Sequence, residues 1–103
     1  MITERLTFRA KYGQGDALVT LMKEANQVMP TQDILAARVY TDFTGTMFTC
    51  AVEFDYANLN TWAKASQGDS AQYGTPEFQA WFARMVACTE TGDRQLLNSE
   101  KLF

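Results

Sequence analysis

Three side chains of different chemistry lie on two neighbouring predicted strands. Arg38 and Tyr40 share one face of a strand predicted over residues 34–41, and Glu53 lies on a return strand predicted over residues 46–54. A buried glutamate can act as a general base, and an arginine can hold an anionic substrate or an enolate. If these faces border a cavity, the three side chains are candidate catalytic residues. The alternative is a cross-strand ion pair between Arg38 and Glu53, an arrangement that is common beside such sheets.

Asn58, Trp62 and Glu4 are further polar candidates, each with a structural alternative. Asn58 and Trp62 are four residues apart, so they share one face of a helix. The alternatives are that Asn58 caps this helix and that Trp62 packs in the core. Glu4 falls on the apolar side of the first predicted strand, with Leu6 and Phe8. Because chain ends fray, we expect this carboxylate to be solvated rather than functional.

The residue counts exclude several classes of site. The 103 residues include no histidine, which excludes Ser-His-Asp and Cys-His nucleophile systems, histidine-ligated metals and a haem held by histidine. The two cysteines, Cys50 and Cys88, form neither a CxxC pair nor a metal-ligand cluster. Nine basic residues against twelve acidic ones disfavour a nucleic-acid surface, which needs clustered Lys and Arg. We therefore expect no metal, no cofactor and no nucleic-acid partner.

The sequence shows no feature of export or of membrane insertion. Residues 1–10 mix charged and apolar side chains and lack the apolar core of a signal peptide. No stretch approaches the ~20 apolar residues that a membrane span requires. Two cysteines are too few for a secreted disulfide framework. We therefore expect a cytoplasmic protein with no membrane partner.

The length of 103 residues predicts one domain over residues 1–103. Hydrophobic periodicity predicts that it is built from strands and helices in a definite order. Asp16 is placed to cap the first helix, Thr75 and Pro76 form a typical helix start, and the last strand is predicted to begin at Arg94. The predicted segments are a strand at 2–10, a helix at 16–29, strands at 34–41 and 46–54, a helix from 58 that is interrupted at 67–70 and resumes at 75, and a strand at 94–103. This order predicts an α+β fold of the ferredoxin-like βαββαβ type, with a four-stranded antiparallel sheet and the helices on one face.

The predicted hairpin raises a packing problem. Both of its strands carry apolar residues on both faces, which is typical of central strands covered on two sides. Helices can cover only one face of a four-stranded sheet. We therefore expect a second copy of the chain to cover the other face, giving a homodimer with a cavity between the two sheets. Such a cavity would suit a small hydrophobic or aromatic ligand.

Short motifs along nearly the whole chain resemble those of a known family. They are Met1-Ile2-Thr3-Glu4 with Thr7-Phe8, Lys11 and Gly13 before the first helix, Glu53-Phe54 followed by Leu59 and Trp62, and Thr75-Pro76-Glu77-Phe78-Gln79-Ala80-Trp81. These motifs look like those of NIPSNAP-type proteins. That family belongs, with the antibiotic-biosynthesis monooxygenases, to the dimeric α/β-barrel superfamily. The resemblance implies the ferredoxin-like fold and its assembly into a dimeric α/β barrel.

The resemblance also bears on function. Asn58 and Trp62 are similar to the oxygen-activating set of the monooxygenase branch, in which an apolar pocket holds a phenol that itself reduces oxygen, so no metal or cofactor is required. Tyr73 lies too far along the chain to complete that set. Because the superfamily also includes isomerases and dehalogenases, the fold does not settle the function. We expect a small-molecule-binding homodimer with an apolar cavity, acting as a cofactor-independent oxygenase or isomerase. The alternative is a non-catalytic ligand-binding or structural dimerisation module.

Overall fold

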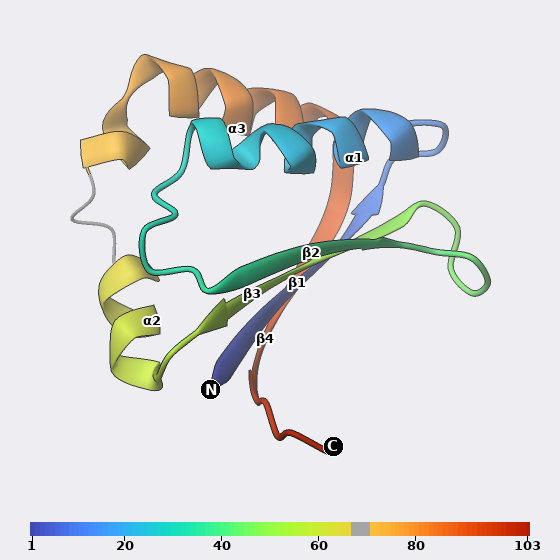
Figure 1. Cartoon of the computed structure of the whole chain (residues 1–103). Coiled ribbons are helices and arrows are strands. Elements are labelled where there is room, and N and C mark those ends of the chain that lie inside the picture. Colours follow the sequence, from blue (N-terminus) through green and yellow to red (C-terminus); the bar gives the residue numbers. More distant parts are fainter. Residues whose placement is uncertain (67–70) are drawn as a thin grey trace.

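The computed structural model describes residues 1–66 and 71–103, and it confirms the predicted order of elements (Figure 1). The strands form one four-stranded antiparallel sheet in the order β2-β3-β1-β4. The elements are β1 (Ile2–Ala10), α1 (Gly15–Glu24), the 3₁₀ helix η1 (Ala25–Gln27), β2 (Ala36–Thr41), β3 (Thr49–Tyr56), α2 (Leu59–Ser66), the 3₁₀ helix η2 (Ala71–Gly74), α3 (Pro76–Cys88) and β4 (Thr89–Asn98). The fold is therefore α+β and ferredoxin-like. The interruption predicted at residues 67–70 lies outside the described residues.

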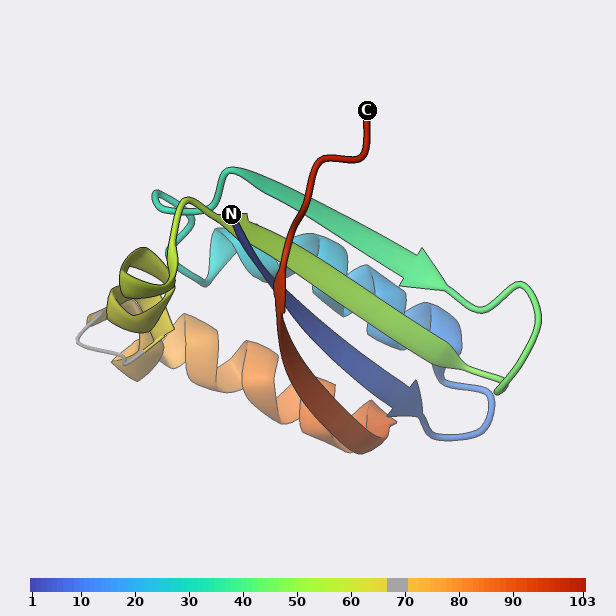
Figure 2. The same ribbon diagram turned by 90° about the horizontal axis from the view of Figure 1, so that it is seen from below.

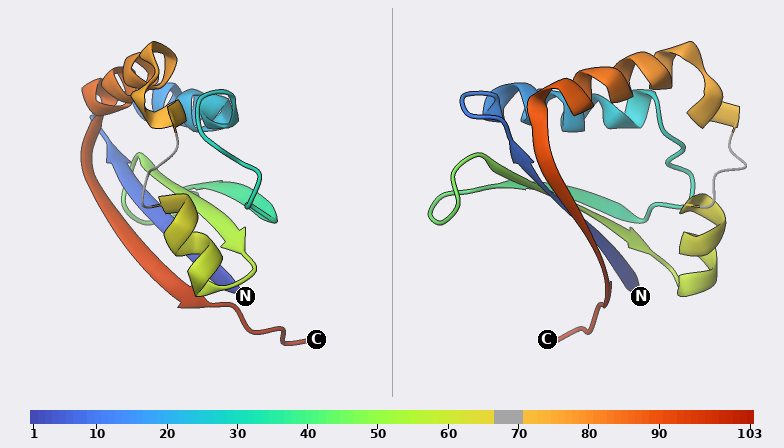
Figure 3. Two further views of the ribbon diagram at one scale, coloured as in Figure 1. Left: turned by 90° about the vertical axis from the view of Figure 1, so that its left-hand side faces the viewer. Right: turned by 180° about the vertical axis from the view of Figure 1, so that it is seen from behind.

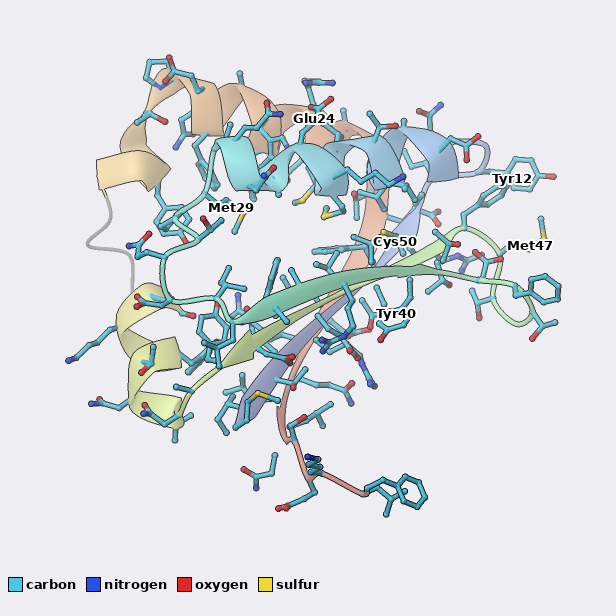
Figure 4. All side chains as sticks on the ribbon, in the orientation of Figure 1. Tyr12, Glu24, Met29, Tyr40, Met47 and Cys50 are labelled. Carbon is cyan, nitrogen blue, oxygen red and sulfur yellow. The ribbon has the colours of Figure 1, made fainter. Side chains whose placement is uncertain are left out.

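The molecule has a helical layer on one face of the sheet, here called the inner face. Helices α1 and α3 lie side by side over this face, while α2 lies apart from them beyond the end of β3 (Figures 1 and 3). Strand alternation directs Leu6 and Phe8 of β1, and Cys50 and Val52 of β3, toward the helices. On the opposite, outer face no described helix covers the strands (Figure 2). Figure 4 shows this division, with Cys50 on the helix side of the sheet and Tyr40 on the other.

The core lies between the inner face and the two long helices. Leu18 of α1 is completely buried there. Trp81 of α3 donates its indole N–H to the carbonyl oxygen of Leu21 in α1, at 2.8 Å. At this point α1 tightens into a 3₁₀ turn, because the Ala25 N–H bonds to the Met22 carbonyl. Trp81 therefore links the two helices by a hydrogen bond as well as by packing.

Helix α1 differs from the prediction at both ends. Asp16 is not its cap, because the helix begins at Gly15 and Gln14 occupies the cap position without a side-chain hydrogen bond. The chain turns earlier than expected since Gly13 adopts a φ of 80°, a conformation that glycine reaches without strain. Asp16 instead lies in the first turn, where its charge is favourable to the helix dipole. The α-helical part ends at Glu24, earlier than predicted.

The hairpin is shorter than predicted, and its first strand lies at the sheet edge. In the described part of the chain β2 pairs with β3 alone, so the prediction that both hairpin strands are central is wrong for β2. The second strand, predicted over 46–54, begins only at Thr49, because Phe48 adopts a left-handed conformation with φ 62°. The Asp42 carboxylate then accepts a hydrogen bond from the Thr49 N–H at 2.9 Å and closes the loop. Strand β3 continues to Tyr56.

The outer face is polar, which corrects the expectation that the hairpin is apolar on both sides. Met47, which falls within the strand predicted over 46–54, lies in the loop before β3. The side chains that β2 and β3 direct to this face include Arg38, Ala51, Glu53 and Asp55. The apolar second face on which the predicted homodimer was based is therefore absent from the hairpin strands. The homodimer itself stays a prediction.

Helix α3 begins where the sequence predicts. The Thr75 hydroxyl accepts a hydrogen bond from the Phe78 N–H at 3.2 Å, and Pro76 occupies the first helical position. None of the helices in the described residues is long and apolar enough to cross a membrane.

Strand β4 begins earlier than predicted. Helix α3 passes directly into β4 at Thr89, so the prediction that the last strand starts at Arg94 is wrong. Gly92, predicted to lie before this strand, lies within it and opposite Phe8 of β1. A Cβ atom at Gly92 would lie 3.0 Å from the Phe8 ring. This glycine therefore leaves space for the ring rather than ending an element.

Candidate functional site

A hollow of about 340 Å³ lies between the inner face of the sheet and the helices. Its walls are almost entirely apolar. On the helix side, sulfur-containing and aromatic side chains predominate, namely Met22, Met29, Phe78, Trp81, Phe82 and Met85. Concave apolar spaces of this size take small organic molecules.

A second hollow, of about 510 Å³, adjoins the first on the side of α2. The residues that border both hollows are Leu6, Met29, Phe54, Phe78 and Arg94. Polar groups gather in the second hollow, where Glu4, Tyr56, Tyr73 and Gln79 contribute to the walls. The two hollows together therefore give an apolar compartment with a polar end.

Glu4 is the buried carboxylate of this polar end. The residue is only 6% exposed, so the expectation that it is solvated is wrong. Its Oε2 accepts a hydrogen bond from the indole N–H of Trp62 in α2, at 3.0 Å, and lies 3.4 Å from Nε of Arg94. The chain end does not fray here, because β1 is held between β3 and β4 from Ile2 onward.

The sheet register explains why these groups meet. Glu4 lies opposite Phe54 of β3 and Leu96 of β4. Tyr56 and Arg94 are each two residues from those partners, so they are diagonal neighbours of Glu4 on the inner face. The sequence reasoning missed Tyr56 and Arg94 as site residues. Glu4, Tyr56 and Arg94 all have even numbers, and in this sheet the even-numbered residues of β1, β3 and most of β4 share one face. Finding this from the sequence required the register between β1 and β4, and the start of β4 was predicted too late.

Two phenols in the second hollow remain protonated at neutral pH. Burial, assisted by the negative charge of Glu4, raises the pKa of Tyr56 to about 12. Burial and the same charge also raise the pKa of Tyr73. Both side chains can therefore act as neutral hydrogen-bond donors beside the carboxylate.

An aromatic series connects the polar end to the apolar compartment. Tyr73 packs edge-on against Phe78, with ring centroids 5.0 Å apart. Phe78 in turn packs against Trp81 at 5.8 Å and Phe82 at 6.0 Å. Such ring contacts fix the orientation of the side chains. The aromatic wall of the two hollows is therefore held in place by contacts among its own rings.

The structure separates the roles of Asn58 and Trp62. Asn58 lies just before α2, and its side-chain oxygen accepts hydrogen bonds from the Thr61 N–H at 2.8 Å and from the Thr61 hydroxyl at 3.0 Å. Asn58 therefore caps α2, which was the structural alternative given for this residue. Trp62 instead contacts Glu4 at the hollow. Tyr73, which looked too distant along the chain, lines the same hollow.

Arg38, Tyr40 and Glu53 come together on the outer face, away from the hollows just described. Nη2 of Arg38 lies 3.1 Å from Glu53, so the cross-strand ion pair given as the alternative is present. Arg38 also donates two hydrogen bonds to the Asp55 carboxylate, both at 2.9 Å. Arg5 of β1 holds the other oxygen of Glu53 at 2.8 Å. Tyr40 contributes to the electrostatics of this network, lowering the pKa of Glu53 slightly further.

The two acids of this network are stabilised as carboxylates. The Arg38 hydrogen bonds hold the pKa of Asp55 below its usual value, against the opposing effect of burial. Burial acts to raise the pKa of Glu53, but hydrogen bonds from Arg5 and Arg38 outweigh it, so this pKa is also lowered. In residues 1–66 and 71–103, no group of three or more His, Cys, Asp or Glu side chains is placed to hold a metal ion.

Comparison with known proteins gives structural matches without a sequence match. Neither a protein-family model nor a curated protein matches the chain. A NIPSNAP domain protein from Burkholderia xenovorans superposes with a TM-score of 0.79 at 20% identity, covering 100% of this chain and 98% of that one. A NIPSNAP family protein from Agrobacterium tumefaciens gives a TM-score of 0.76 at 16% identity, covering 98% and 94%.

An oxygenase has a similar fold. SnoaB, a cofactor-independent oxygenase from Streptomyces nogalater, gives a TM-score of 0.68 at 8% identity, covering 97% of this chain and 93% of that one. At such identities the matches establish the fold and not a shared activity. The chain therefore has the ferredoxin-like α+β fold that these NIPSNAP and antibiotic biosynthesis monooxygenase structures share.

Proposed function

We propose that this protein binds a small, largely apolar molecule carrying a hydrogen-bonding group, in the hollows between the sheet and helices α1 and α3. The observation that carries the proposal is the buried carboxylate of Glu4 at the end of an apolar compartment. Removing a carboxylate from water is costly unless close partners compensate. Glu53 has two arginines at 2.8 and 3.1 Å, whereas the arginine beside Glu4 lies at 3.4 Å and has a side chain that is 64% exposed. The position of this acid at the end of an apolar hollow supports a binding site there.

The walls suggest the chemistry of the ligand. Phe54, Phe78 and Met29 border both hollows and offer an apolar surface to a flat hydrocarbon body. Glu4 can accept a hydrogen bond from a hydroxyl or amine of the ligand, and the Tyr73 phenol can donate one. We therefore propose a neutral ligand with an apolar body and one polar end.

Isothermal titration calorimetry with 2-naphthol tests this proposal, because that probe has an apolar bicyclic body and one hydroxyl. We expect saturable binding with one site per chain. Glu4→Gln should weaken binding by about tenfold or more, the usual value of a hydrogen bond to a charged group. Glu90→Gln, which changes an exposed acid in β4, should bind as the wild type does. Absence of saturable binding, or equal affinity in Glu4→Gln, would contradict the proposal.

We propose that the protein also acts as an enzyme, which oxygenates or isomerises the bound molecule without a cofactor. The fold shared with SnoaB supports this, as does the placing of Trp62 and Tyr73 around Glu4. The outer face carries the side chains of Arg38, Tyr40 and Glu53. They could therefore be catalytic only if a second copy of the chain forms a cavity against that face. The alternative is a ligand-binding module without catalysis.

A structural dimerisation module is the second candidate. The outer face is uncovered, and the C-terminus lies on that side of the sheet (Figure 1). Leu102 and Phe103 of this tail are 85% and 99% exposed. We propose that a second copy packs on the outer face. The free Cys50 and Cys88 agree with the proposed cytoplasmic location.

A further inference from the structure

We infer that Glu4 is the proton acceptor of a keto–enol proton transfer on a bound apolar ketone, and that the phenols of Tyr56 and Tyr73 stabilise the enolate oxygen. This inference rests on the proposed function, because the ketone must occupy the same hollows. It goes beyond binding in naming a reaction and the residues that carry it out.

The carboxylate meets the first requirement of such a reaction. Glu4 lies in the wall of the 510 Å³ hollow, to which the apolar side chains of Leu6 and Phe54 also contribute. Because Glu4 is buried, electrostatic interactions at its carboxylate are stronger than they would be in bulk water. Trp62 holds one carboxylate oxygen at 3.0 Å, which fixes the orientation of Glu4 toward the hollow. Trp62 is therefore a positioning residue.

The two tyrosines meet the second requirement. Tyr56 and Tyr73 contribute to the wall of the same hollow as Glu4, from β3 and from η2 respectively. Their pKa values are raised, so both keep a proton to donate. A donor held in place where negative charge develops lowers the barrier more than a mobile water molecule does. An acceptor and two donors therefore border one hollow.

The reaction balances with the groups present. The Glu4 carboxylate removes a proton from the carbon next to the ketone carbonyl, and an O–H bond forms on Glu4. The electron pair of the broken C–H bond forms a carbon–carbon double bond, and the carbonyl π pair moves to oxygen, where a phenol O–H donates to it. Return of the proton to the same carbon restores the ketone, while return to a conjugated carbon isomerises it. No oxidant or reductant is consumed.

Deuterium exchange into 1-indanone tests the inference. This flat bicyclic ketone exchanges its C2 protons in D₂O through the enolate, and proton NMR follows the loss of their signal. We expect the wild-type full chain to exchange them at least tenfold faster than buffer. Glu4→Gln should lower the protein-dependent rate by roughly 10²-fold, a usual contribution of general base catalysis. Glu90→Gln is the control and should exchange like the wild type.

Three further variants test the roles of the neighbours. Tyr73→Phe and Tyr56→Phe should slow exchange at saturating 1-indanone by roughly tenfold or more. Trp62→Phe should slow exchange at saturation with little change in the dissociation constant, because it disturbs the orientation of Glu4 rather than the apolar walls. Thermal unfolding followed by circular dichroism checks that each variant is folded.

The possible outcomes separate this inference from the proposed function. Binding of 1-indanone without accelerated exchange, or unchanged exchange in a folded Glu4→Gln, would overturn the proton transfer alone. Binding of 2-naphthol but not of 1-indanone would overturn the assignment of a ketone. If neither probe binds, both the inference and the proposed function fail.

Discussion

At the scale of single residues, two buried glutamates on opposite faces of the sheet have different surroundings. Glu53 is held by Arg5 and Arg38, and its charge is compensated within the sheet. Glu4 receives an indole N–H at 3.0 Å and lies 3.4 Å from one exposed arginine. The first arrangement compensates the charges within the sheet, while the second is the basis of the proposed binding site.

Loss of Arg38 should destabilise the protein measurably. Arg38→Met removes the hydrogen bonds to Asp55 and one partner of Glu53, leaving buried carboxylates less well paired. We expect a loss of about 1–2 kcal/mol in the free energy of unfolding, moderated because the arginine is itself partly exposed. Arg84→Met, which breaks an exposed pair with Glu24 at 3.4 Å, should cost under about 0.5 kcal/mol. Urea unfolding measures both, and equal losses would contradict the proposed role of Arg38.

The same carboxylates predict how stability responds to acid. The folded-state pKa values of Asp55 and Glu53 lie below their usual values, which are about 3.9 and 4.3. The unfolded chain therefore takes up protons first as the pH falls, so the contribution of these groups is full above about pH 5 and is lost as the pH falls through the folded-state values. Asp55→Asn should show a shallower decline in urea midpoint between pH 5 and pH 3. Parallel declines in the variant and the wild type would show that Asp55 does not contribute.

At the scale of elements, α3 depends on a local start signal. The Thr75 hydroxyl caps the helix by accepting the Phe78 N–H, and α3 carries Trp81, which bonds to α1. A weaker start to α3 therefore affects both helices that cover the inner face. It also affects the wall of the hollow, since Phe78 borders it.

Removal of the cap should lower stability without changing the fold. We expect Thr75→Ala to lose about 1 kcal/mol in the free energy of unfolding, as is usual for an N-cap. Thr75→Ser keeps the hydroxyl and should stay close to the wild type. Chemical denaturation of the two variants gives the comparison. A serine variant as unstable as the alanine variant would mean that the hydroxyl is not the stabilising group.

The elements also show what could be predicted from sequence. The start of α3 was predictable because Thr75 and Pro76 act locally, and the element order followed from periodicity. The late start of β3 was not, because it depends on the left-handed Phe48. The burial of Glu4 was not predictable either, since it depends on α2 and on the register with β4, both distant along the chain. Arg38 with Glu53 was predictable as a pair because a hairpin register is short-range.

At the scale of the whole molecule, the outer face is the surface through which we propose that two copies associate. The face is polar over β2 and β3, so its burial depends on keeping the ion network paired. Sedimentation velocity at micromolar concentration should show a dimer. Arg84→Met, on the helical side, should leave it unchanged. A single species with the mass of one chain would contradict the dimer but not the binding site, whose walls come from one chain.

The proposed function requires that a small molecule occupies the hollows beside Glu4. Nitrogen-15 NMR tests it directly, because the chain has two tryptophans and one of them, Trp62, donates its indole N–H to Glu4. On titration with 2-naphthol, we predict a saturable shift of the Trp62 indole signal, assigned with Trp62→Phe, while the backbone amides of Arg38 and Tyr40 on the outer face stay in place. A static Trp62 signal, with shifts confined to the outer-face amides, would contradict the account.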